Sequence, residues 1–162
     1  MVAKGWWLEG VFIRVVESQV FNKILIVCVG NICRSPTAER VLQKLLPLAQ
    51  VESAGLDALE GHAIEPSAAK ILNGRGFNTS DHLGRKVTGQ MVRETDLVLV
   101  MEVWQQQRLM KEFPAISGKV MLLGKWQEGL EINDPYKKSD EAFEAVFGQI
   151  EQACELWARR LS

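Results

Sequence analysis

The sequence is poor in cysteine, in histidine and in excess charge of either sign. Three cysteines in 162 residues cannot form the disulfide framework of a small secreted protein, so a reducing, cytoplasmic location is expected. The two histidines, His62 and His82, show no metal-ligand spacing with any cysteine, which argues against a metal site. Nineteen basic residues balance twenty acidic ones without a block of either sign, so neither nucleic acid nor an anionic membrane is an expected partner.

Long apolar runs are also missing. The most apolar stretch near the start, residues 6–16, is interrupted by Glu9 and Arg14, has no small-residue cleavage site and is too short to span a bilayer. We therefore expect no export and no membrane insertion. Residues 1–20 also lack the pattern that follows them, so we expect an N-terminal extension outside the fold and one domain over residues 21–162.

Four short apolar runs alternate with amphipathic segments over this domain. The runs predict strands at residues 24–27, around 51, 97–101 and 120–123, and the segments predict helices at 35–46, 66–74, 104–113 and 143–161. Parallel neighbours need a crossover, so this order predicts an α/β doubly wound sheet of about four parallel strands with helices on both faces. Ligands bind such sheets beyond the carboxyl ends of the strands.

The segment between the first predicted strand and its helix fits a tetrahedral anion. Cys28 and Arg34 stand six residues apart in it. Gly30 is expected to give the backbone the conformation that turns its N–H groups inward, and Ser35 is expected to be the N-cap of the helix. The helix dipole and these N–H groups attract an anion, and Arg34 can donate two parallel hydrogen bonds to a phosphate. The same field favours the thiolate form of Cys28, which is the form that attacks phosphorus.

The residues around this loop resemble a known family. The run over residues 27–39, Val-Cys-Val-Gly-Asn-Ile-Cys-Arg-Ser-Pro-Thr-Ala-Glu, resembles the signature of the low-molecular-weight protein tyrosine phosphatases, and four later segments resemble the family in order and approximate spacing: 53–55, 81–85, 96–101 and 134–136. The resemblance runs from about residue 21 to the end and implies a flavodoxin-like fold. It also implies an enzyme that hydrolyses phosphotyrosine through a phosphocysteine intermediate and needs no cofactor.

The resemblance assigns residues to this reaction. Cys28 would take the phosphoryl group, Arg34 would clamp the phosphate, and Asp134 would protonate the leaving phenolate. The Ser35 hydroxyl would help to hold Cys28 as the thiolate. The phosphate-binding loop would comprise Val29, Gly30, Asn31, Ile32, Cys33, Arg34 and Ser35.

Other residues would support the loop or line the substrate pocket. The resemblance implies that Asn31 and His82 brace the loop by hydrogen bonds and that Tyr136, the only tyrosine, forms one wall of a slot for an aromatic ring. Leu56 would belong to an aliphatic opposite wall, where animal members of the family often carry an aromatic residue. Without the loop at Cys28, Asp134 and the proline after it would indicate a turn instead of an acid.

Two lysines, Lys137 and Lys138, stand where family members often carry a second tyrosine. With the aliphatic wall, they resemble the bacterial branch that dephosphorylates tyrosine kinases of capsule and exopolysaccharide synthesis and export. The resemblance therefore implies a tyrosine-phosphorylated protein as partner, specifically a bacterial tyrosine kinase, and we expect a cytoplasmic monomer.

The remaining cysteines leave one alternative open. Cys33 is equally consistent with a reversible disulfide to Cys28 and with a small buried hydrophobe. Cys154 lies on the apolar face of the last predicted helix, where core packing is the expected role.

Three rival functions fit the loop less well. An arsenate reductase of similar fold would need two more cysteines in mid-chain, and residues 34–153 contain none. A non-catalytic phosphotyrosine-binding module could dispense with Cys28 or Asp134, and a phosphocysteine carrier would need neither Arg34 nor a leaving-group acid. The chain keeps all three residues, which favours catalysis.

Overall fold

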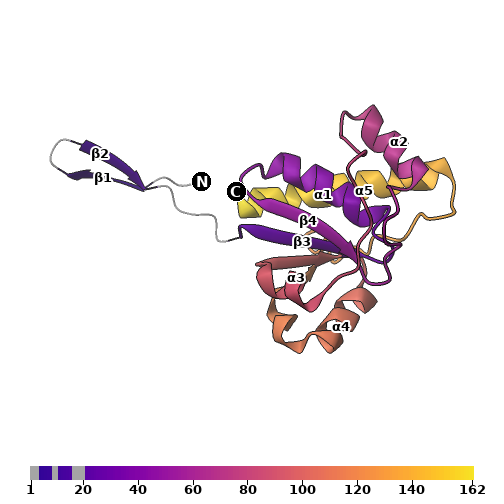
Figure 1. The fold of residues 1–162 in the computed structure, drawn as a ribbon. Coiled ribbons are helices and arrows are strands. Elements are labelled where there is room, and N and C mark those ends of the chain that lie inside the picture. The colour runs from indigo at the N-terminus through magenta and orange to yellow at the C-terminus, as the bar shows by residue number, and fades with distance from the viewer. Residues whose placement is uncertain (1–3, 9–10, 16–20) are drawn as a thin grey trace.

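The computed structural model of the chain describes residues 4–8, 11–15 and 21–162 (Figure 1). Within the N-terminal extension, β1 (Lys4–Leu8) and β2 (Val11–Val15) pair antiparallel and form a two-stranded sheet of their own. No strand or helix had been predicted for this segment. The rest of the extension, residues 1–3, 9–10 and 16–20, lies outside the described residues, and the domain boundary at residue 20 stays a prediction.

The main sheet has four parallel strands in the order β4-β3-β5-β6, which confirms the predicted α/β fold. The strands are β3 (Lys23–Cys28), β4 (Gln50–Gly55), β5 (Leu97–Val100) and β6 (Val120–Leu122). The chain passes from β3 to β4 on one side and then returns to β5 on the other side of β3. The strand order therefore reverses at the carboxyl end of β3, where ligands bind in sheets of this kind.

Helices cover both faces of this sheet (Figure 1). One face carries α1 (Arg34–Leu45), α2 (Pro66–Gly74) and α5 (Asp140–Leu161), and the other carries α3 (Gly89–Glu94), α4 (Val103–Glu112) and the 3₁₀ helix η1 (Pro114–Lys119). The period-2 alternation of β3 explains the two layers, because Ile24 and Ile26 pack on the first face while Leu25 and Val27 pack on the second.

The structure contains two short helices that the sequence analysis missed, α3 and η1. Each has six residues, too few to show a helical period in the sequence. A local signal for α3 was present, because the Thr88 hydroxyl accepts a hydrogen bond from the Met91 N–H at 3.2 Å and so caps the helix.

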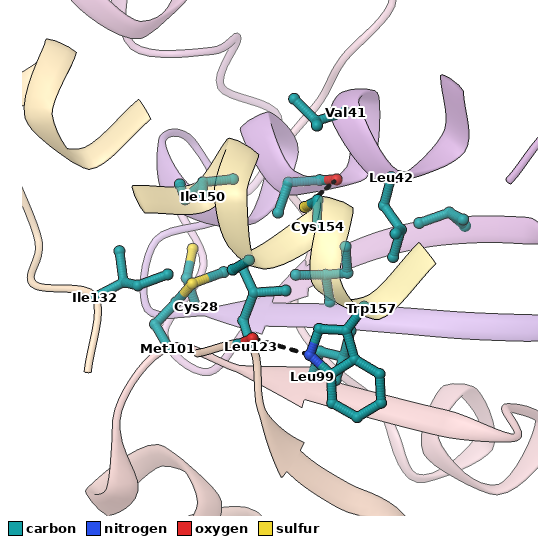
Figure 2. Packing of buried hydrophobic residues seen from close by; sticks show 14 of the residues in the cluster. Cys28, Val41, Leu42, Leu99, Met101, Leu123, Ile132, Ile150, Cys154 and Trp157 are labelled. Atoms are coloured by element: carbon teal, nitrogen blue, oxygen red, sulfur yellow. Dashed lines mark hydrogen bonds between the residues drawn. The ribbon is translucent and has the colours of Figure 1, made fainter. Parts of the chain in front are cut away.

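The larger core layer lies between the sheet and the long helix α5 (Figure 2). Trp157 is 4% exposed, and its indole N–H donates a 2.9 Å hydrogen bond to the carbonyl oxygen of Leu123, so that the buried indole leaves no donor unpaired. Cys154 is fully buried beside α1, as predicted, and burial raises the pKa of its thiol. Cys28 joins the same cluster next to Met101 and Ile132, so the end of β3 is fixed by the core.

None of the helices among the described residues combines the length and apolar character needed to cross a membrane.

Candidate active site

A cavity of about 190 Å³ opens where β3 ends, at the reversal of strand order. The loop between β3 and α1 forms its floor, and the segments after β4 and β6 form its sides. Its lining residues are Cys28, Val29, Gly30, Ile32, Cys33, Arg34, Asp57, Leu59, Asp134 and Tyr136. The fold thus brings the three residues predicted to act in the reaction to a single cavity, although about a hundred positions separate the last from the other two.

The loop takes its sharp path at Asn31, which adopts a left-handed conformation with φ of 57°. Gly30, which was expected to let the backbone turn its N–H groups inward, is not among the described residues with positive φ. Asparagine tolerates the left-handed region because its short polar side chain can hydrogen-bond locally. A side chain at position 30 would meet only ordinary van der Waals contacts, with Ile32 and Leu59.

Asn31 is fully buried and holds the loop through four hydrogen bonds. Its Nδ2 donates to the hydroxyls of Ser35 and Ser53 at 2.8 and 3.0 Å, and its Oδ1 accepts from the Arg85 N–H at 2.9 Å. Its carbonyl oxygen lies 2.6 Å from Nε2 of His82, which is 7% exposed. Segments from β4 and from the region before α3 are therefore tied to one loop residue.

Ser35 lies inside α1 and is not its N-cap. The helix begins at Arg34, Cys33 occupies the N-cap position without a side-chain capping bond, and the Thr37 N–H donates to the Cys33 carbonyl at 3.2 Å. The prediction was wrong because the Ser35 hydroxyl has other partners: it lies 3.0 Å from the sulfur of Cys28 and accepts the Asn31 amide. A buried hydroxyl beside the sulfur can stabilise negative charge there.

Arg34 is held by partners from the segments that follow β5 and β6. Its side chain is 1% exposed, and its Nη1 donates to the Glu102 carboxylate and, at 2.7 Å, to the carbonyl oxygen of Ile132. Its Nη2 lies 3.4 Å from Oδ2 of Asp134. The contact of Glu102 with Arg34 was not predicted from the sequence. The available signal was an acidic residue two positions beyond a buried strand, at the edge of the sheet where ligands bind.

Asp134 both lines the cavity and shapes a turn. Its Oδ1 accepts a 3.0 Å hydrogen bond from the Tyr136 N–H, as in an Asx-turn, while its Oδ2 faces Arg34. The two interpretations of Asp134, as a turn residue and as an acid in the site, are therefore compatible in this structure.

The walls of the cavity match the prediction on one side only. Tyr136 lines the cavity and is 43% exposed, so its ring is open to a ligand. Leu56 is 1% exposed and packs in the core beneath α4, because it continues the inward alternation of β4; its predicted place in the wall is wrong. Leu59 and Asp57 line that side.

Cys33 lies in the cavity wall and is 6% exposed. Burial raises the pKa of its thiol, and the neighbouring Cys28 and Asp134 act in the same direction. All three cysteines are free. In the part of the chain that the structure describes, no three His, Cys, Asp or Glu side chains gather as ligands for a metal ion.

Comparisons with known proteins agree with this geometry. The family model described as low molecular weight phosphotyrosine protein phosphatase matches residues 23–162. The low molecular weight protein-tyrosine-phosphatase Etp of Escherichia coli strain K12 is 47% identical over 142 residues, which are 88% of this chain and 96% of Etp. The corresponding phosphatase Wzb of Salmonella typhimurium strain LT2 is 46% identical over 143 residues, 88% of this chain and 96% of Wzb.

A similar crystal structure is that of the tyrosine phosphatase Wzb from Escherichia coli K30 in complex with sulphate. It superposes with a TM-score of 0.85 at 43% sequence identity and covers 88% of this chain and 99% of its own.

Proposed function

The chain belongs to the low molecular weight phosphotyrosine protein phosphatase family, and on that premise we propose that it hydrolyses phosphotyrosine through a covalent phosphocysteine at Cys28. One observation carries this proposal. Cys28, Arg34 and Asp134 line one cavity, with the cysteine at the end of the central strand and the arginine at the start of the helix that follows. Nucleophile, anion clamp and acid are the three roles that phosphoryl transfer from an aromatic alcohol needs.

In the first step the Cys28 thiolate attacks phosphorus, the P–S bond forms and the P–O bond to the tyrosine ring breaks. Asp134 delivers its proton to the departing phenolate oxygen, so tyrosine leaves neutral. The Ser35 hydroxyl, 3.0 Å from the sulfur, stabilises the thiolate before attack. Asn31 keeps the loop N–H groups turned toward the phosphate oxygens.

In the second step the Asp134 carboxylate accepts a proton from water, and the water oxygen attacks phosphorus. The P–S bond breaks, the thiolate of Cys28 re-forms and inorganic phosphate leaves. Arg34 binds phosphate oxygens in both steps, while Glu102 and the Ile132 carbonyl fix its guanidinium. A preorganised arginine loses little freedom when it binds the anion.

We assign the substrate class from the site and from the relatives. A phosphorylated protein, and specifically an autophosphorylating tyrosine kinase of capsule or exopolysaccharide synthesis and export, is the proposed substrate of a cytoplasmic monomer. The aliphatic side chain of Leu59 in the wall and Lys137 after Tyr136 support this bacterial branch.

The test is steady-state hydrolysis of p-nitrophenyl phosphate and of a phosphotyrosine peptide. Cys28→Ser should be inactive, and rapid acid quenching of wild type with radiolabelled peptide should trap label on Cys28. Asp134→Ala should lose on the order of a hundredfold or more in kcat on the peptide and less on nitrophenyl phosphate, because nitrophenolate leaves with little help from an acid. Asp140→Ala, an exposed aspartate on α5, is the matched control.

Two results would contradict the proposal. If folded wild type binds phosphate but turns over neither substrate, the site belongs to a binding module. If Asp134→Ala slows both substrates equally, Asp134 acts on the loop or on Arg34 and is not the proton donor.

A further inference from the structure

We infer that three cations around the mouth of the cavity, Lys86, Arg108 and Lys137, select phosphotyrosine whose neighbouring residues are acidic. This inference rests on the proposed function and names a substrate class for the same site. Below, the three side chains are called the cationic rim.

Arg108 is fixed at the mouth by a residue of the cavity wall. It projects from α4, and its Nη1 and Nη2 donate to the two carboxylate oxygens of Asp57, each at 2.7 Å. Asp57 lines the cavity, and its own N–H donates to the carbonyl of Val29 in the phosphate-binding loop at 3.0 Å. Asp57 thus connects the Arg108 guanidinium to the phosphate-binding loop, so that Arg108 lies beside the cavity although it comes from α4.

Lys86 adds a second positive charge to this side. Its backbone pairs with Gly55, two residues before Asp57, its side chain is exposed, and its charge acts on Asp57 together with that of Arg108. Glu112, one helical turn beyond Arg108, also acts on Arg108. The four charges on this side sum to zero, but Asp57 and Arg108 are bonded to each other, so the exposed ammonium of Lys86 is a cation that this pair does not neutralise.

An exposed cation also lies on the opposite side of the mouth. The ammonium of Lys137 lies 5.4 Å from the centre of the Tyr136 ring, which forms that wall. Asp134, the acid on this side, faces the buried Arg34, whose charge it shares with Glu102. Lys137 is thus the exposed charge nearest to the tyrosine wall among these groups, and an acidic residue next to a bound phosphotyrosine would meet it.

Arg108 and Asp57 allow an electrostatic role to be separated from a structural one. If the pair only fastens the wall to α4, removing either partner breaks the same link and shifts activity in the same direction. If the charges select the substrate, the two changes act in opposite directions: Arg108→Gln removes the cation, whereas Asp57→Asn removes the anion that offsets it.

The experiment measures kcat/KM for two phosphotyrosine peptides that differ only in having Glu or Gln on both sides of the phosphotyrosine. Wild type should favour the Glu peptide. Arg108→Gln and Lys137→Gln should each lower the Glu/Gln ratio by about two- to fivefold, the effect of one exposed charge pair, and Asp57→Asn should raise it. Raising the salt from about 0.05 M to about 0.5 M should bring the wild-type ratio toward one, because the Debye length falls from about 14 Å to about 4 Å.

Lys44→Gln provides the matched control, since it removes the same charge from an exposed position at the far end of α1 and should leave the ratio unchanged. A wild-type ratio of one, or a shift in the same direction for Arg108→Gln and Asp57→Asn, overturns the inference. Turnover of p-nitrophenyl phosphate, which has no neighbouring residues, reports the proposed function separately: if it is absent, the proposed function fails, and if it is present with a ratio of one, only the selectivity fails.

Discussion

The cost of replacing Asn31 follows from its contacts. Asn31→Ala deletes three side-chain hydrogen bonds, to Ser35, Ser53 and the Arg85 N–H, at about 1 kcal/mol each. It also places alanine in the left-handed region, which costs about 1 kcal/mol more. The free energy of unfolding should therefore fall by about 4 kcal/mol, a large share of the stability of a domain of this size.

Asn31→Gly separates the two contributions. Asn31→Gly loses the same hydrogen bonds, but glycine adopts positive φ without strain. The free energy of unfolding of this variant should therefore be about 1 kcal/mol higher than that of Asn31→Ala. Urea unfolding followed by circular dichroism measures both variants. Asn78→Ala is the matched control, because that asparagine is exposed and its side chain accepts hydrogen bonds from nearby Ser80, so its loss should cost less than about 1 kcal/mol.

Activity should fall with stability. Release of the Asn31 side chain lets the loop shift, and a misplacement of about 1 Å at a phosphate-binding loop can cost on the order of a hundredfold in kcat/KM. The reasoning is refuted if Asn31→Gly is as stable as wild type, or if Asn31→Ala is the more stable of the two variants. Either result would mean that the loop holds its shape without this side chain.

Three further predictions concern other parts of the domain. Gly55→Ala should prevent stable folding, because its Cβ would lie 2.4 Å from a carbonyl oxygen of the phosphate-binding loop, whereas Gly148→Ala in α5, with nothing within 4 Å, should raise the free energy of urea unfolding by about 1 kcal/mol; equal effects would contradict this. Hydrogen bonds from Arg108 hold the pKa of Asp57 below its usual range, so the ion pair stabilises the folded state above about pH 4 and is lost as the pH falls through the depressed value. Wild type should exceed Arg108→Gln by no more than about 1 kcal/mol near neutral pH, and a difference that persists near pH 2 would count against the ion pair. Because burial raises the pKa of the Cys33 thiol, mass spectrometry after iodoacetamide treatment near pH 8 should find Cys33 unmodified until urea unfolds the protein. Modification of Cys33 at the same rate in the folded and in the urea-unfolded protein would contradict this prediction.

Most of the fold could be predicted because buried strands and helices differ in how their apolar residues are spaced along the sequence. The β-branched run at Ile24 and Ile26 became the central strand, and the apolar stripe ending at Trp157 became α5. The helices α3 and η1 were not predicted because six residues are too few to show a helical repeat of apolar positions. The strands β1 and β2 were not predicted, because residues 1–20 do not share the α/β pattern of the rest of the chain.

The candidate site could be predicted where backbone chemistry determines it. Cys28 lies at the end of β3 and Arg34 at the start of α1, and the strand–loop–helix pattern of the sequence fixes both positions. The prediction for Leu56 was wrong because this residue continues the alternation of β4 and packs beside Ala54 in the core, whereas Asp57 and Leu59 line the cavity. Glu102 needs the sheet order β3-β5 to come near Arg34, and that order is a tertiary property.

The order of synthesis separates the parts of this site in time. Arg34 is made early, yet its partners Glu102, Ile132 and Asp134 come from the last two-fifths of the chain. The proposed acid follows the arginine by 134 − 34 = 100 residues, and at a translation rate of about 5–20 residues per second the ribosome needs roughly 5–20 s to cover them. During that interval a nascent chain carries Cys28 and Arg34 without the proposed acid and without the groups that hold the arginine. The proposed site is therefore complete only after most of the chain has been synthesised.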